Sequence, residues 1–145
     1  MHKRPYSLIA LMSVYKWAMI LGIGTDLVEV HRIRESISRF GDRFTHRIYT
    51  DREQAYCRSK ANAAERFAGR FAAKEAGMKA IGTGWRRGVT WRDFEVANEP
   101  SGRPTLKLYG VAEKIAKDLG VQRISLSLTH TAQEGFAIVI LEDGR

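Results

Sequence analysis

Two carboxylates stand out because of where they lie in the sequence. Asp26 follows Gly22-Ile23-Gly24-Thr25 at the end of a short apolar segment, where a carboxylate with small neighbours can face a ligand. The competing interpretation is a helix cap, since Asp is a preferred N-cap residue. Glu75 lies beside the apolar stripe of an alanine-rich segment, one helical turn before Lys79. Glu75 either forms an ordinary i,i+4 ion pair with Lys79 or faces a cleft.

Two carboxylates from different elements suit Mg²⁺, which prefers oxygen ligands and keeps several waters and substrate phosphates. Their spacing is no metal signature by itself, because they are far apart in the sequence. His130 ends a strand of alternating polar residues and is open to three roles: a general base, a phosphate contact or a structural residue. Cys57 is the only cysteine, which excludes an intrachain disulfide and a cysteine zinc cluster. We interpret Cys57 as a helix residue and not as a nucleophile.

The elements that position these residues indicate a single small α+β domain. Strands are expected at residues 20–24, 94–98, 105–108, 123–129 and 136–141, and the last is apolar enough to be a central strand. A helical stripe runs from Val30 to Ile48, and Gly41 is expected to break or bend it. Thr50 and Glu53 form a capping box, so a further helix begins near residue 51. Helices are also expected at residues 62–80 and 111–119.

Composition and charge narrow the possible partners. With 145 residues, 44% of them hydrophobic and 28% charged, the chain is an ordinary globular domain and neither a disordered tail nor a polytopic membrane protein. The formal net charge is +8, which favours a polyanion: nucleic acid, an anionic membrane, a phosphorylated small molecule or an acidic protein. Residues 1–18 resemble a weak signal peptide, but Lys16 interrupts the apolar run. We expect an extension outside the domain, or a natural start at Met19.

Several blocks of the sequence resemble the holo-[acyl-carrier-protein] synthases, the small bacterial 4'-phosphopantetheinyl transferases. The first block is GIGTDLVEVHR at residues 22–32, and the second is ERFAGRFAAKEA at residues 65–76. The stretches at 47–53, 79–84, 101–104 and 125–131 agree with them, in the same order. Together the Gly-x-Asp-x-x-Glu and Phe-Ala-x-Lys-Glu-Ala patterns are highly specific. His31 and Arg103 depart from the family pattern without touching the two carboxylates.

The resemblance implies a fold and a reaction. The fold is a compact domain over residues 19–145, in which an antiparallel sheet packs against helices, and it assembles as a homotrimer with coenzyme A between subunits. The reaction moves the 4'-phosphopantetheine arm of coenzyme A to a serine of an apo acyl carrier protein and releases adenosine 3',5'-bisphosphate. It takes place in the cytoplasm and involves neither nucleic acid nor a membrane.

The resemblance also implies roles for individual residues. Mg²⁺ would be held by Asp26 and Glu75, and the chemistry would fall to Glu75 and Lys79. Coenzyme A would be contacted by Arg70, Lys79, Gly82 and His130. The acidic carrier would dock on Arg32, Arg39 and Arg43, whose spacing by seven and four residues predicts one shared helical face away from the core. The base that accepts the serine proton stays open between Glu75, a metal-bound water and another acid.

Two alternatives compete with this interpretation. The first is a basic module that binds nucleic acid, which needs exposed aromatic residues interleaved with Lys and Arg. The sequence offers such a cluster in Trp85, Trp91 and Phe94 with Arg86, Arg87 and Arg92. The second is a degenerate member of the resembled family that binds coenzyme A without turning it over.

Overall fold

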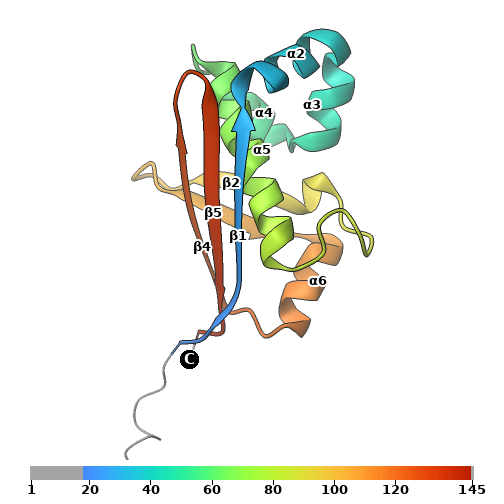
Figure 1. Cartoon of the computed structure of the whole chain (residues 1–145), viewed down its shortest axis with the longest axis vertical. Coiled ribbons are helices and arrows are strands. Elements are labelled where there is room, and N and C mark those ends of the chain that lie inside the picture. Colours follow the sequence, from blue (N-terminus) through green and yellow to red (C-terminus); the bar gives the residue numbers. More distant parts are fainter. Residues whose placement is uncertain (1–17, 145) are drawn as a thin grey trace, which may run out of the picture.

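A three-stranded antiparallel sheet joins the beginning of the domain to its end. In the computed structural model, which describes residues 18–144, strands β1 (Ile20–Glu29), β4 (Arg123–His130) and β5 (Glu134–Glu142) pair in the order β1-β5-β4 (Figure 1). The central position of β5 confirms the prediction from its apolar run. Strand β1 continues to Glu29 where the sequence predicted an end at Gly24. The predicted extension at residues 1–18 lies outside the described residues, except for its last residue.

The helices of the described region lie to one side of this sheet (Figure 1). Helix α5 (Ala63–Ala80) packs along β1 and β5, and α6 (Gly110–Asp118) lies near the end of the sheet where β1 begins. Helices α2 (Val30–Phe40), α3 (Asp42–Ile48) and α4 (Asp51–Arg58) gather at the opposite end. The predicted break falls at Gly41, whose φ of 55° separates α2 from α3. None of the helices in the described region has the length and apolar character needed to cross a bilayer.

A hairpin of β2 (Phe94–Asn98) and β3 (Pro104–Leu108) packs against α5 and follows the short 3₁₀ helix η1 (Trp91–Asp93). Trp91 and Phe94 are buried in the core. The exposed aromatic surface that a nucleic-acid module needs therefore does not form on this hairpin, and of the three aromatic residues considered only Trp85 is exposed.

Two glycines let β1 touch α5 backbone to backbone. A Cβ placed on Gly24 would lie 1.9 Å from the carbonyl oxygen of Ala76, and a Cβ on Gly22 would lie 2.1 Å from the carbonyl oxygen of Ala80. Any side chain at these positions would force the strand away from the helix, because interiors are already close-packed. The two glycines therefore set the distance between β1 and α5, on which Asp26 and Glu75 lie.

A buried ion pair ties α4 to α5. Lys74 Nζ lies 2.6 Å from Glu53 Oε1, and both side chains are fully buried. The Lys74 ammonium also donates to the carbonyl oxygens of Trp91, at 3.2 Å, and Phe94. Glu53 Oε2 accepts the backbone N–H of Val96 at 3.1 Å. Burial lowers the pKa of Lys74, while the adjacent Glu53 carboxylate acts in the opposite direction.

The outer face of the sheet is apolar and exposed. Ile23 and Leu27 on β1 are 58% and 60% exposed, and Phe136 on β5 is 37% exposed. The pairing register sets Ile23 opposite Ile140 and Leu27 opposite Phe136, so these side chains form one continuous surface. Contiguous apolar patches of this kind mark interaction surfaces.

Candidate active site

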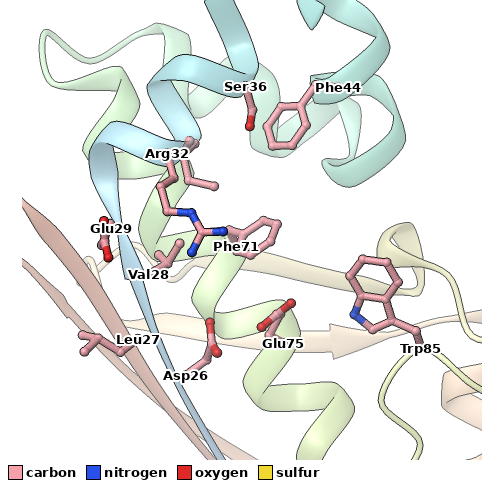
Figure 2. Close-up of a pocket in the computed structure, with 11 residues that line it drawn as sticks. Asp26, Leu27, Val28, Glu29, Arg32, Ser36, Phe44, Phe71, Glu75 and Trp85 are labelled. Carbon is pink, nitrogen blue, oxygen red and sulfur yellow. The ribbon is translucent and has the colours of Figure 1, made fainter. Parts of the chain in front are cut away.

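Asp26 and Glu75 converge on one cavity of about 360 Å³ between β1, α2, α3 and α5 (Figure 2). Asp26 extends from β1 and Glu75 from α5, and their carboxyl groups lie near each other (Figure 2). The pKa of Glu75 is raised to about 7, first by burial and then by the hydrogen bond to Asp26 and its charge. Lys79 and the indole N–H of Trp85 act in the opposite direction on this pKa.

The structure corrects one interpretation of each carboxylate. Asp26 is no helix cap, because it lies inside β1 opposite Ala137, and α2 begins only at Val30. Lys79 does not serve merely as the i,i+4 partner of Glu75, since its ammonium lies 3.3 Å from Asp26 Oδ1 and 2.9 Å from the carbonyl oxygen of Thr25. Lys79 thus bridges α5 to β1 beside the carboxylate pair.

Apolar and polar side chains both line this cavity. Val28, Ile33, Phe44 and Phe71 line it together with the polar residues Glu29, Arg32 and Ser36, and Trp85 closes one side. The Arg32 guanidinium is directed into the cavity, towards the region between Phe71 and the carboxylates (Figure 2). The cavity therefore combines charged side chains with an apolar wall at Phe44 and Phe71.

The carboxylate pair fits a hard divalent cation. The described residues contain no cluster of three or more His, Cys, Asp or Glu side chains that could hold a metal, so any cation here would rely on these two side chains. Mg²⁺ commonly binds through one or two carboxylates and completes its shell with water and substrate phosphates.

Arg70 and His130 meet in a second cavity of about 300 Å³, between α5, the hairpin and the end of β4. Arg70 donates to Asn98 Oδ1 at 2.7 Å, and its guanidinium lies 4.1 Å from the Tyr56 ring centroid. The Arg70 Nε is buried without a hydrogen-bond partner among the described residues. His130 Nδ1 lies 3.1 Å from Glu65 Oε2. An unused buried donor beside a histidine suits an anionic ligand.

The remaining predicted residues lie outside these two cavities. Arg39 is exposed on α2 with its guanidinium 5.3 Å from the Phe40 ring centroid, and Arg43 is exposed on α3. The break at Gly41 therefore separates Arg43 from the helix that carries Arg32 and Arg39. Gly82 is an exposed residue of the turn after α5, with a φ of 79°. Cys57 is buried in α4, and burial raises the pKa of its thiol to about 12, as expected of an inert cysteine.

Two features of the site were not predicted. Lys74, next to Glu75, is buried with Glu53 and fixes this part of α5. Its spacing could have revealed it, because Lys74 falls on the helical stripe of Phe67, Phe71 and Met78. Trp85 lies beside Glu75 in the wall of the cavity, on the loop after α5, and no sequence pattern predicts this position.

Comparison with known proteins gives a consistent result. The sequence profile of the 4'-phosphopantetheinyl transferase superfamily matches residues 22–140. A holo-[acyl-carrier-protein] synthase of Koribacter versatilis is 65% identical over 125 residues, which cover 86% of this chain and all of that protein. The crystal structure of the holo-[acyl-carrier-protein] synthase from Neisseria meningitidis superposes with a TM-score of 0.77 at 37% identity, covering 85% of this chain and 98% of the other.

A further solved structure contains a ligand. The holo-(acyl-carrier-protein) synthase from Bacillus anthracis, in complex with CoA (3',5'-ADP), gives a TM-score of 0.72 at 35% identity and covers 87% of this chain and 99% of the other. The profile match and the relatives extend over nearly the whole described domain and include both carboxylate-bearing elements. The chain therefore belongs to the 4'-phosphopantetheinyl transferase superfamily, among the holo-[acyl-carrier-protein] synthases.

Proposed function

We propose that this protein transfers 4'-phosphopantetheine from coenzyme A to a serine of an apo acyl carrier protein and releases adenosine 3',5'-bisphosphate. The observation that carries the proposal is the convergence of Asp26 and Glu75, 49 residues apart in the sequence, on one cavity beside the Lys79 ammonium. Family membership supports the reaction, and the Bacillus anthracis relative was solved in complex with CoA (3',5'-ADP).

The chemistry is a substitution at phosphorus. The serine oxygen forms a new bond to the phosphorus that carries the pantetheine arm, the bond from that phosphorus to the bridging oxygen of the pyrophosphate breaks, and the serine proton passes to a base. Such transfers depend on positioning and on neutralising phosphate charge. Mg²⁺ held by Asp26 and Glu75 would supply that neutralisation and orient the pyrophosphate.

The chain's own residues prepare this cavity in three ways. Asp26 and Glu75 provide the oxygen ligands, and Glu75 is also our candidate to receive the serine proton. Lys79 brings a positive charge within 3.3 Å of Asp26, where it would stabilise a phosphate or the leaving group. Arg32 brings a second positive charge into the cavity from α2 (Figure 2).

We further propose that coenzyme A binds between two copies of the chain within a cytoplasmic homotrimer. In one chain, the residues that line the carboxylate cavity and those that line the Arg70–His130 cavity have no member in common. A single coenzyme A that used both sets of residues would reach them most directly if neighbouring subunits each supplied one cavity. The exposed apolar face of the sheet offers the contact surface that such an assembly needs. Arg70, His130 and the turn at Gly82 remain our candidates for contacts with coenzyme A.

The acidic carrier would dock beside the carboxylate cavity. Arg32, Arg39 and Arg43 are exposed at the same end of the molecule, on α2 and α3. Charges of this kind mainly set the association rate and its dependence on salt. The apolar wall of the cavity, at Phe44 and Phe71, would accept an apolar side chain of the docked partner.

Mass spectrometry tests the proposal. The protein is incubated with apo carrier, coenzyme A and MgCl₂, and the carrier is expected to gain the mass of one phosphopantetheine. Asp26→Ala and Glu75→Ala should each abolish the gain while the proteins keep their native circular dichroism spectra. Asp118→Ala, which removes an exposed carboxylate at the end of α6, is the matched control and should react normally. Full activity in both cavity variants would contradict the assignment of the carboxylates.

A further inference from the structure

The loop that follows α5 brings a tryptophan back to the carboxylate pair. The backbone N–H groups of Thr83 and Gly84 both donate to the carbonyl oxygen of Met78, at 3.1 and 3.3 Å, and Arg86 N–H donates to Thr83 at 3.0 Å. Glycines at 82, 84 and 88 and the non-glycine Arg87 adopt positive φ values, so the backbone turns sharply several times. This turn sets the Trp85 side chain beside Glu75, more than two helical turns earlier in the sequence (Figure 2).

Trp85 is held by contacts on one side and is open to solvent on the other. Its ring meets Trp91 edge to face, with centroids 5.0 Å apart at 74°, and Trp91 stacks on Phe71 at 4.8 Å. The indole nitrogen points towards the Glu75 carboxylate (Figure 2), and both residues line one small pocket beside the carboxylate cavity. The residue is nevertheless 65% exposed. Because so much of its apolar surface stays in water, Trp85 gains little free energy from burial. Burial therefore does not explain why the side chain lies beside Glu75.

Each carboxylate of the pair has its own donor. Lys79 lies 3.3 Å from Asp26, and the Trp85 indole nitrogen is directed at Glu75 (Figure 2). Two neighbouring carboxylates repel each other when both are ionised, so a Glu75 side chain with no donor would turn towards solvent. A neutral N–H donor can hold Glu75 without adding a charge that would compete with a cation.

We propose that Trp85 is a positioning residue that holds the Glu75 carboxylate against Asp26 through its indole N–H and closes the open side of the cavity with its ring. The inference rests on the proposed function, because it assigns Trp85 a part in preparing that same carboxylate pair. Partners that orient metal-binding side chains typically contribute 10- to 100-fold to metal affinity. We expect about tenfold here, at the lower end of that range, because the donor is neutral and Trp85 is 65% exposed.

Calorimetric titration of the protein with MgCl₂ alone tests this role. Trp85→Phe keeps an aromatic ring and removes the N–H, and it should weaken Mg²⁺ binding about tenfold. Tyr109→Phe, which keeps an aromatic ring and removes an O–H donor to Glu95 outside this cavity, is the matched control and should bind as the wild type does. In the transfer assay, Trp85→Phe should require correspondingly more Mg²⁺ for half-maximal rate. Unchanged Mg²⁺ affinity in Trp85→Phe would overturn the inference.

A second measurement on the unmodified protein guards against a variant that fails to fold. In ¹⁵N-labelled protein, the Trp85 indole N–H is expected to exchange slowly and to shift on addition of MgCl₂, whereas fast exchange and no shift would overturn the inference. Glu75→Ala distinguishes the role of Trp85 from the proposed function of the carboxylate pair. If Glu75→Ala abolishes Mg²⁺ binding while Trp85→Phe has no effect, only the role of Trp85 fails. If Glu75→Ala binds Mg²⁺ as the wild type does, the proposed function fails as well.

Discussion

Replacing Gly24 by alanine should separate the two carboxylates without touching either. The added Cβ would lie 1.9 Å from the carbonyl oxygen of Ala76 and 2.8 Å from the backbone nitrogen of Ala80. Since Cβ atoms essentially never approach another atom closer than 3.0 Å, β1 and α5 must part by about 1 Å. The obstructing atoms belong to a helix backbone and cannot rotate away.

Two magnitudes follow from this displacement. Overpacking of a tight interior costs about 1–3 kcal/mol of unfolding free energy. A catalytic group misplaced by about 1 Å can lose about 100-fold in rate. Because Asp26 lies two residues after Gly24 on the displaced strand, we expect the loss of transfer rate to exceed what the loss of stability alone would cause.

Urea denaturation and the carrier-loading assay measure the two effects separately. Gly69→Ala is the matched control, because it also replaces a buried glycine at the contact between α5 and the sheet. Its added Cβ would meet only the Leu128 side chain, at 3.7 Å, which is ordinary contact. Gly69→Ala should therefore be active and more stable by roughly 0.5–1 kcal/mol, the usual gain for this change inside a helix. A Gly24→Ala protein with wild-type stability and rate would refute the packing explanation of the glycine pair.

Three further changes test other features of the molecule. Lys74→Met should lower the free energy of unfolding in urea by about 3–5 kcal/mol, because it leaves the Glu53 carboxylate buried and unpaired. Adding Glu53→Gln should restore part of this loss. A double variant less stable than Lys74→Met would contradict that explanation. The raised pKa of Glu75 stabilises the metal-free fold below pH 4.5, and this stabilisation should be lost as the pH rises through about 7. Urea midpoints measured with EDTA should fall over that range relative to those of Glu75→Gln, and parallel curves would count against the shift. Ile23→Glu should dissociate the proposed trimer in light scattering, whereas Leu119→Glu, at an exposed apolar residue directly after α6, should leave it assembled.

Local patterns predicted most of the elements because each has a local cause. The capping box is present as predicted, with Thr50 N–H donating to Glu53 Oε1 at 2.9 Å, and Gly41 ends α2 where the apolar stripe is interrupted. The predicted end of β1 at Gly24 is too early, because a glycine after a short apolar segment indicates the end of a strand when the sequence is considered alone. Gly24 instead allows close packing of β1 against α5. This contact involves a helix about 50 residues away, so the sequence of the strand alone cannot predict it.

The candidate site was predictable in its residues but not in its contacts. The pairing of Asp26 with Glu75 came from a resemblance, since nothing in the spacing of two distant acids specifies their meeting. The partner of Lys79 could not be predicted from the sequence. Helical periodicity favours Glu75, whereas the fold brings Asp26 within 3.3 Å of the Lys79 ammonium. Trp85 escaped prediction because a loop with several positive φ values carries no periodic signal.

The Glu53 carboxylate has a consequence for how the molecule can move. It is bonded at once to the start of α4 through Thr50, to β2 through Val96 and to α5 through Lys74. These three segments cannot open one at a time without exposing a buried charge, so their amide hydrogens should exchange with solvent as one cooperative unit. The segments that move when the cavity opens for substrate entry and product release should therefore be α2, α3 and the Trp85 loop, which lie outside that unit.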